Sequence, residues 1–339
     1  MASLEALNRE LIDECGRDDS DLKKVRDLLQ RGAEVNAEDE NGDTALIYAS
    51  SRGHDTVVRE LLKHDSLEVN AKDNGGETAL MYASCEGHAA IVRELLKHDR
   101  INVNAKTSRG QTALWCAIRE DRIAILLMLL QHERIDVNAK LVNGFTALMF
   151  ASKVGREAVV RELLKHDRID VNAKSSNGHT ALMCASREGR EAIVHELLKH
   201  DSLEVNAKDN GGRTALIWAS KKGHEAIVRE LLKYDNIDVN TTDLNGGSAF
   251  FWASSLGHLC VMHEFLKHET VNVNATGKLG NTALMMACFR GQLDMVSELL
   301  KFPTVDVHVT NKAGSTALDI AYGLELVEIA GRLEEYTKK

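Results

Sequence analysis

Residues 42–64 read GDTALIYASSRGHDTVVRELLKH, and close copies of this segment return at a constant step of 34 residues, as from Thr44 to Thr78. The triplet Thr-Ala-Leu, or its variant Ser-Ala-Phe, opens nine such copies, at Thr44, Thr78, Thr112, Thr146, Thr180, Thr214, Ser248, Thr282 and Thr316. Nine copies in phase predict a single solenoid, in which each unit buries its apolar face against its neighbours, rather than two globular domains.

Two glycine columns frame the first half of each copy. One glycine stands two residues before every opening triplet, from Gly42 to Gly314, and a tight turn with positive φ explains this restriction. The Thr that follows is then expected to cap a helix. A second glycine, nine residues after the Thr, ends that helix in seven of the nine copies, whereas Asp121 and Glu325 take its place in the other two.

The second half of each copy predicts another helix and an extended connector. In residues 55–63, Val57, Val58 and Leu61 repeat at helical spacing and form one apolar face. A connector of the form Leu/Ile-x-Val-Asn-Ala follows. Asn fills its column in eight of nine copies, from Asn36 to Asn274, and we predict that this short polar side chain bonds its own turn.

The resulting pattern, G-x-T-A-L-x-x-A-S-x-x-G-H-x-x-I-V-x-x-L-L-x-x-x-x-x-x-V-N-A, resembles the ankyrin repeat over residues 39–321. Two departures are a period of 34 against the usual 33, and Ala in place of the family's Pro after Thr. The resemblance implies an all-α solenoid of stacked helix-turn-helix units with protruding β-turn or hairpin loops. We expect an N-terminal capping unit at 1–38, eight repeats at 39–310 and a C-terminal capping repeat at 311–339.

Composition narrows the class of protein. The 339 residues include 42 Lys and Arg against 51 Asp and Glu, and the net charge of −9 disfavours sequence-independent nucleic-acid binding. No stretch approaches the ~18 uncharged apolar residues of a membrane span, and the charged N-terminus does not read as a signal peptide. The six cysteines show no CxxC spacing. We expect a soluble, monomeric, cytoplasmic protein, with the nucleus also open.

The sequence offers no recognisable chemistry. It holds no P-loop, nucleophile elbow or HExxH motif. Most histidines fall in two repeating columns, one after Gly and one after Lys, and stacked helices ~8–10 Å apart hold equivalent side chains too far apart to share a metal ion. We therefore expect a non-catalytic protein without metal or cofactor.

The resemblance implies that the first helices and the turn tips line a concave groove in which a protein partner docks. Aromatic residues and arginine are frequent anchors of such interfaces, although the aromatic side chains could instead pack only between neighbouring first helices. Charge also changes along the groove, from acidic in the first two repeats to basic in the sixth, which would set the direction of a partner. The candidate contact residues are Tyr48, Arg52, Glu77, Tyr82, Arg109, Phe145, Phe150, His179, Arg187, Arg213, Trp218, Lys221, Lys222 and Trp252.

Three further possibilities stay open. A small anionic or nucleotide ligand could occupy the basic part of the groove near Trp218, between Arg187, Arg213, Lys221 and Lys222. The third repeat replaces charged columns by Ile123, Leu127 and Met128, and this apolar stripe could form a second interface. The resemblance also permits hydroxylation of the Val-Asn-Ala asparagines.

Overall fold

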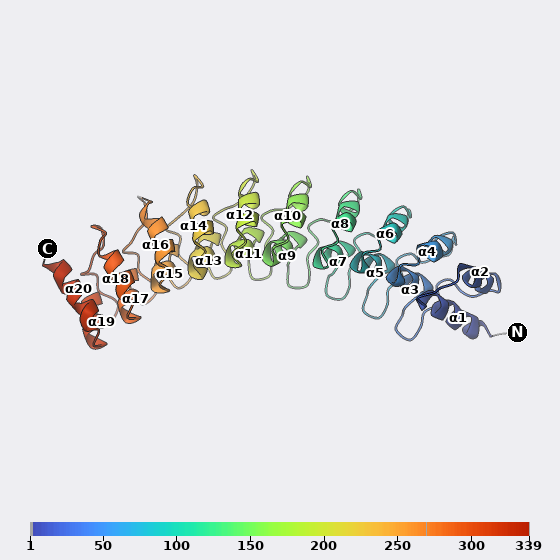
Figure 1. The fold of residues 1–339 in the computed structure, drawn as a ribbon, viewed down its shortest axis with the longest axis horizontal. Coiled ribbons are helices and arrows are strands. Elements are labelled where there is room, and N and C mark those ends of the chain that lie inside the picture. The colour runs from blue at the N-terminus through green and yellow to red at the C-terminus, as the bar shows by residue number, and fades with distance from the viewer. Residues whose placement is uncertain (1–2, 269, 339) are drawn as a thin grey trace. The chain divides into compact units, whose positions relative to one another are not determined.

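The computed structural model describes residues 3–268 and 270–338, which form an all-α array of paired helices (Figure 1). In each pair we call the odd-numbered member the first helix and the even-numbered member the second helix. Their bounds are α1 Leu4–Gly16, α2 Leu22–Gln30, α3 Ala45–Arg52, α4 Asp55–Leu61, α5 Ala79–Glu86, α6 Ala89–Leu96, α7 Ala113–Arg119, α8 Ile123–Leu130, α9 Ala147–Val154, α10 Glu157–Leu164, α11 Ala181–Arg187, α12 Glu191–Leu198, α13 Ala215–Lys222, α14 Glu225–Leu231, α15 Ala249–Ser255, α16 Leu259–Leu266, α17 Ala283–Phe289, α18 Leu293–Leu299, α19 Ala317–Gly323 and α20 Val327–Thr337.

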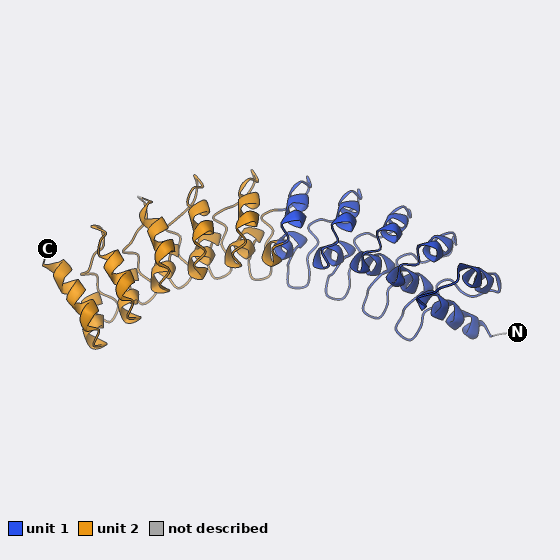
Figure 2. Ribbon diagram, viewed as in Figure 1, with its two compact units in different colours: residues 1–151, 156–170 blue, residues 152–155, 171–339 orange. Residues whose placement is uncertain are grey.

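The chain divides into two compact units (Figure 2). One unit comprises residues 1–151 and 156–170, and the other comprises residues 152–155 and 171–339. Both are built from the same kind of helix pair, and a hairpin loop precedes each first helix from α3 onward. Within the first unit, these loops extend from the row of first helices on the side away from the second helices (Figure 1).

The ends of the first helices confirm the sequence prediction. The Thr44 hydroxyl accepts the N–H of Ile47 at 3.3 Å, and the equivalent Thr or Ser makes this bond in every later repeat. Gly53 then ends α3 with φ of 82°. Asp121 and Glu325, at φ of 58°, are the non-glycine residues with positive φ in the described ranges, so the helix ends there too, at a conformational cost.

The glycine two residues before each capping Thr or Ser is required for two reasons, its positive φ and the close approach of the next hairpin. Gly42 has φ of 78°, and a Cβ atom added there would lie 3.0 Å from the backbone nitrogen of Asn74 in the next hairpin. That nitrogen donates to the carbonyl of Asn41 at 2.8 Å. Consecutive hairpins therefore approach each other so closely that a side chain at Gly42 would separate them.

Packing between repeats supplies most of the helical stability. Helices of seven or eight residues, such as α4 and α3, are marginal in isolation. Their apolar residues are almost fully enclosed, and Val57, Val58 and Leu61 are each 1% exposed or less. Burying a side chain of this size is worth about 1.5–3 kcal/mol. Each helix pair thus depends on the pairs on either side of it.

The connector asparagine that follows Val has other hydrogen-bond partners than the sequence predicted. The Asn104 Nδ2 donates to the carbonyl of Arg134 at 2.6 Å, and its Oδ1 accepts the N–H of Asp136 at 2.8 Å. Each bond reaches the connector of the next repeat, so the prediction that this side chain bonds its own turn is wrong. Stacking of the repeats brings the next connector within reach of the asparagine side chain. The backbone N–H and carbonyl groups of that connector need hydrogen-bond partners, and the asparagine supplies them. The same two bonds form at Asn36, Asn70, Asn138, Asn172, Asn206, Asn240 and Asn274.

Replacing one such asparagine should weaken the contact between two repeats. We expect Asn104→Ala to lower the free energy of unfolding by about 1–3 kcal/mol, because it leaves a backbone donor and acceptor without their partner. Urea denaturation followed by circular dichroism measures the change. Asn102→Ala is the matched control, since the Asn102 side chain accepts only a local bond from the N–H of Asn104. Equal losses in the two variants would contradict the assignment.

Candidate functional site

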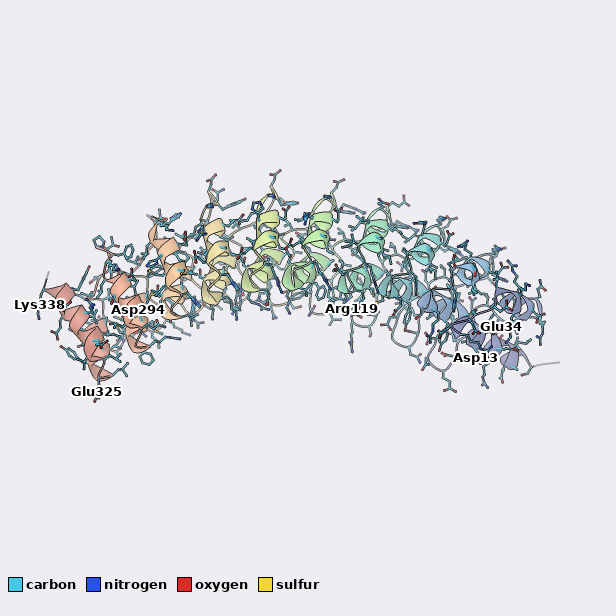
Figure 3. All side chains as sticks on the ribbon, in the orientation of Figure 1. Asp13, Glu34, Arg119, Asp294, Glu325 and Lys338 are labelled. Carbon is cyan, nitrogen blue, oxygen red and sulfur yellow. The ribbon has the colours of Figure 1, made fainter. Side chains whose placement is uncertain are left out.

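The two helix rows use their charges differently. On the second helices, the recurring lysine at the C-terminal end pairs with a glutamate three residues earlier, as Lys63 does with Glu60 at 2.8 Å. The same pairs form at Lys97, Lys165, Lys199, Lys267 and Lys301. These recurring charges therefore serve the helix itself. Side chains also project from the other row (Figure 3), and we call the first helices α3 to α19, with the hairpin loop preceding each, the hairpin-side face.

Four aromatic side chains of the hairpin-side face are hydrogen-bonded to their own hairpins. The Tyr48 hydroxyl donates to Asp39 Oδ2 at 2.9 Å, and the Tyr82 hydroxyl donates to Asp73 Oδ2 at 2.7 Å. Trp218 and Trp252 donate in the same way through Nε1, to Asp209 at 3.1 Å and to Asp243 at 3.0 Å. In each case the aspartate lies nine residues before the aromatic residue.

The other oxygen of the same aspartate holds the turn. Asp39 Oδ1 accepts the N–H groups of Asn41 and Asp43, at 2.8 and 2.9 Å. Burial alone would raise the pKa of Asp39, but these hydrogen bonds, together with the Tyr48 hydroxyl, bring the pKa below its ordinary value. The sequence pattern predicted an acidic turn tip here but not this structural role of the aspartate. The sequence does contain a signal for this role. Where Tyr or Trp stands four residues after the capping Thr or Ser, Asp stands nine residues before the aromatic residue. By contrast, Thr107 stands nine residues before Cys116, and Leu141 stands nine residues before Phe150.

Trp218 is a buried platform for two arginines rather than an open contact. Its side chain is only 8% exposed. The guanidinium carbons of Arg213 and Arg187 lie 4.2 and 5.5 Å from its ring centroid. Arg213 also donates from Nε to the enclosed Asp209 carboxylate at 2.9 Å. A partner at this place would therefore meet the arginines before the indole ring.

Positive side chains surround this platform. Arg187, Trp218, Lys222 and His224, together with Glu188, line a hollow of about 440 Å³. Arg187 pairs with Glu188 at 2.8 Å, which offsets part of the positive charge. The Lys221 amine, from the same helix as Trp218, lies 4.1 Å from the ring centroid of the half-buried Trp252 in the next repeat. The predicted residues Arg187, Arg213, Trp218, Lys221, Lys222 and Trp252 thus form one basic and aromatic cluster.

Negative side chains crowd the hairpins of the first two repeats. Burial, and then the nearby charges of Asp39, Asp73 and Glu77, raise the pKa of Asp43 to about 6. The pKa of Glu77 is also raised, by burial and by Asp73. Like charges held this close destabilise one another. This acidic cluster is therefore an unfavourable feature of the chain alone.

Most of the remaining predicted contact residues are dispersed. Arg52 lies 3.3 Å from Asp18, and Arg109 is an exposed residue at a hairpin tip. Phe150 packs on Trp115, with 4.2 Å between ring centroids. Phe145 is half-buried on the hairpin before α9. His179, on the hairpin before α11, is the exception, because its ring centroid lies 5.7 Å from that of Trp218 and its Nε2 lies 3.4 Å from Asp209 Oδ2, so it joins the cluster around Trp218.

The apolar stripe of the third repeat lies on α8, among the second helices. Leu127 is 37% exposed, whereas Ile123 and Met128 are half-buried. This leaves one open leucine with two partly covered neighbours. The stripe is smaller than the sequence pattern alone would indicate.

The histidines after glycine are structural. The His88 Nε2 lies 2.9 Å from the carbonyl oxygen of Ser51 in the preceding repeat, and His54, His224 and His258 make the equivalent contact. Within residues 3–268 and 270–338, no group of three or more His, Cys, Asp or Glu side chains could hold a metal ion. Over the same residues, no helix is long and apolar enough to cross a membrane.

The acidic cluster predicts a pH-dependent stability. Because folding raises the pKa of Asp43 to about 6, from an unfolded value of about 3.9, the folded chain holds this proton more tightly. The destabilisation by Asp43 therefore grows as the pH rises through this window. We expect Asp43→Asn to raise the melting temperature at neutral pH, and this gain to vanish under acidic conditions below the window. Thermal melts across pH measure it, with the exposed Asp65→Asn as control. A variant that melts no higher than the native chain at neutral pH would refute the prediction.

The buried aspartates predict a second stability difference. Asp209 and the equivalent Asp243 each accept from a tryptophan and from two N–H groups of their own turn, and Asp209 accepts in addition from Arg213 Nε. We expect Asp209→Asn to cost about 2–4 kcal/mol, and more than Asp243→Asn, because it also deprives Arg213 of its carboxylate partner. Chemical denaturation of both variants measures the difference. The same loss in both would show that the Arg213 ion pair contributes nothing.

Comparison with known proteins agrees with this architecture. The family described as ankyrin repeats (3 copies) matches residues 15–107, 100–175, 168–243 and 250–333, and so most of the chain. The crystal structure of the ankyrin repeat protein EF0377 is similar with a TM-score of 0.54 at 23% identity, over 60% of this chain and 99% of that chain. At this identity the likeness shows the fold alone. A search of curated proteins found no match. The chain belongs to the ankyrin repeat family.

Proposed function

We propose that this chain is a non-catalytic scaffold that binds a protein partner through its hairpin-side face. Ankyrin repeats are generally protein-binding modules. The observation that carries the proposal is the contrast between the two helix rows. The second helices pair their recurring charges internally, whereas on the hairpin-side face carboxylates gather around Asp43, and Arg187, Arg213 and Lys222 gather around Trp218, although Arg187 and Arg213 each also contact a carboxylate.

The acidic cluster favours a positively charged partner segment. Burial and nearby negative charges raise the pKa of Asp43 and of Glu77, so these two carboxylates are unfavourable in the free chain, and a lysine or arginine placed beside them would relieve that cost on binding. The exposed side chains of Glu40 and Glu86 extend the negative surface. We propose that the first two repeats bind a basic segment of the partner.

The basic cluster favours a negatively charged partner segment. Arg187 and Arg213 are held in place by Trp218, and Lys221 is held against Trp252. Side chains fixed before binding lose little conformational entropy when a partner arrives. The buried Trp218 supports these arginines, whereas part of the half-buried Trp252 side chain is exposed and can be covered by a partner.

A small anionic or nucleotide ligand remains the second candidate for the same cluster. The hollow of about 440 Å³ beside Arg187 and Lys222 favours it. Two ion pairs argue against this ligand, because Arg187 is already paired with Glu188 and Arg213 with Asp209. Addition of ATP to the purified chain separates the two candidates, since only a ligand that binds the folded state raises the melting temperature.

Charge reversal on the hairpin-side face should reduce partner binding. We expect Glu40→Lys/Glu86→Lys to lose the proteins that the native chain captures from a source-cell lysate, because a basic segment would then meet like charge. The control is Glu68→Lys/Glu133→Lys, which makes the same change at exposed sites in the loops after α4 and α8. Circular dichroism verifies that all three chains are folded. Equal capture by both variants would exclude this face as the docking surface, and the stripe of Ile123, Leu127 and Met128 would be tested next.

A further inference from the structure

Two cysteines from neighbouring repeats meet at the hairpin-side face. Cys85 lies near the end of α5, and Cys116 lies in the middle of α7. The enclosed Cys116 thiol and the half-buried Cys85 thiol line the same pocket, close enough to influence each other's pKa. The two residues stand 31 positions apart in the sequence, and stacking of the first helices brings their sulfur atoms together.

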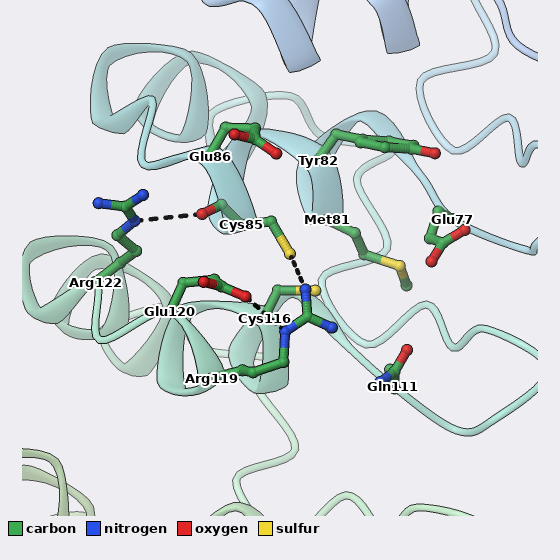
Figure 4. Close-up of a pocket in the computed structure, with 10 residues that line it drawn as sticks. All are labelled: Glu77, Met81, Tyr82, Cys85, Glu86, Gln111, Cys116, Arg119, Glu120 and Arg122. Carbon is green, nitrogen blue, oxygen red and sulfur yellow. Dashed lines mark hydrogen bonds and ion pairs between the residues drawn. The ribbon is translucent and has the colours of Figure 1, made fainter. Parts of the chain in front are cut away.

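An arginine completes the arrangement. The Arg119 Nη2 lies 3.1 Å from Cys85 Sγ, and its Nε donates to Glu120 at 2.7 Å (Figure 4). Arg122 donates to the backbone carbonyl of Cys85 at 3.2 Å. The sulfur of Cys85 therefore has a cation within hydrogen-bonding distance and a second thiol in the same pocket, which is a setting that stabilises a thiolate.

The pair opens into a small cavity. Its volume is about 260 Å³, and its wall includes Tyr82, Cys85, Cys116 and Arg119 (Figure 4). A small molecule can therefore reach the sulfur of Cys85, whereas the Cys116 thiol lies deeper. The carboxylates of Glu77, Glu86 and Glu120 also line the wall, so a neutral reagent fits better than an anion.

Several influences act on the pKa of Cys85 in opposite directions. The hydrogen bond from Cys116 is the largest influence and lowers the pKa of Cys85, while burial raises it; Arg119 then lowers it, and Glu120 and Glu86 raise it. The net direction is downward. Cys116 responds in the opposite sense, because the Cys85 thiolate and burial both raise the pKa of the Cys116 thiol. Cys85 is thus the nucleophile of the pair, and Cys116 is its donor.

We propose that Cys85 is a modification site, at which a thiolate held by Arg119 and Cys116 reacts with small neutral peroxides. The sulfur attacks one oxygen of hydrogen peroxide, an S–O bond forms and the O–O bond breaks. Hydroxide leaves and is neutralised by the buffer, which holds the proton that the thiol released when it became a thiolate. The sulfur is oxidised by two electrons to a sulfenic acid, and the peroxide is reduced.

If solvent exposure alone set the rate of oxidation, the cysteines would react in a different order from the one that we propose, so the proposal can be tested. Cys260 is exposed, whereas Cys85 is half-buried. If access decided the rate, Cys260 would react first. If the arrangement around Cys85 decides the rate, Cys85 reacts first even though it is less accessible.

The experiment treats the full chain with limiting hydrogen peroxide at neutral pH, removes the oxidant, and maps the remaining thiols by alkylation and mass spectrometry. We expect Cys85 to be lost at least about fivefold faster than Cys260, because reaction requires the thiolate. Arg119→Gln should remove that advantage, and Arg119→Lys should keep most of it. The Cys260 rate is the internal reference in every variant.

The outcomes are distinct. If Cys260 reacts as fast as Cys85 in the native chain, the proposal is overturned whether or not the variants fold. It is also overturned if a folded Arg119→Gln chain keeps the native ratio. The variant Cys116→Ala tells whether Cys116 activates Cys85 or only limits access to it. If Cys116 donates to the thiolate, removal of its thiol should slow the oxidation of Cys85. If Cys116 only covers the sulfur, the same change should speed the oxidation.

Discussion

The polar backbone of each connector must find its partners in the neighbouring repeat, and the rest of the structure depends on how this is done. One asparagine per repeat donates to a carbonyl and accepts an N–H two residues further along the next connector. These paired bonds fix the distance and the register of two repeats together. Apolar contacts between helices are less directional, so they fill the space that the asparagines define.

The hairpin-side face is organised by a second polar constraint of the same kind. An aspartate such as Asp73 accepts two backbone N–H groups of its turn through one oxygen, and the tip of an aromatic side chain through the other. This carboxylate holds the hairpin against the first helix. The arginine and lysine side chains that rest on Trp218 and Trp252 are consequently presented from a rigid base.

Sequence periodicity predicted the all-α fold and the ends of the helices, because the capping Thr and the turn glycine act within a few residues of their own position. Contacts that depend on stacking were harder to predict. The partners of Asn104 lie 30 and 32 residues further along the chain, so the local turn was the wrong place to look for them. Cys85 and Cys116 occupy different positions in their repeats, and only the packing of α5 on α7 makes them neighbours. The burial of Trp218 likewise depends on side chains from two repeats.

The spacing of the inter-repeat bonds also bears on how the chain folds. The asparagine bonds join residues 30 and 32 positions apart, and the histidine contacts join residues 37 positions apart, whichever repeats they connect. No such bond requires the closure of a loop much longer than one repeat, so the entropy lost at each step is nearly the same along a unit. Folding of either unit can accordingly nucleate at any adjacent pair of repeats and spread outward one repeat at a time.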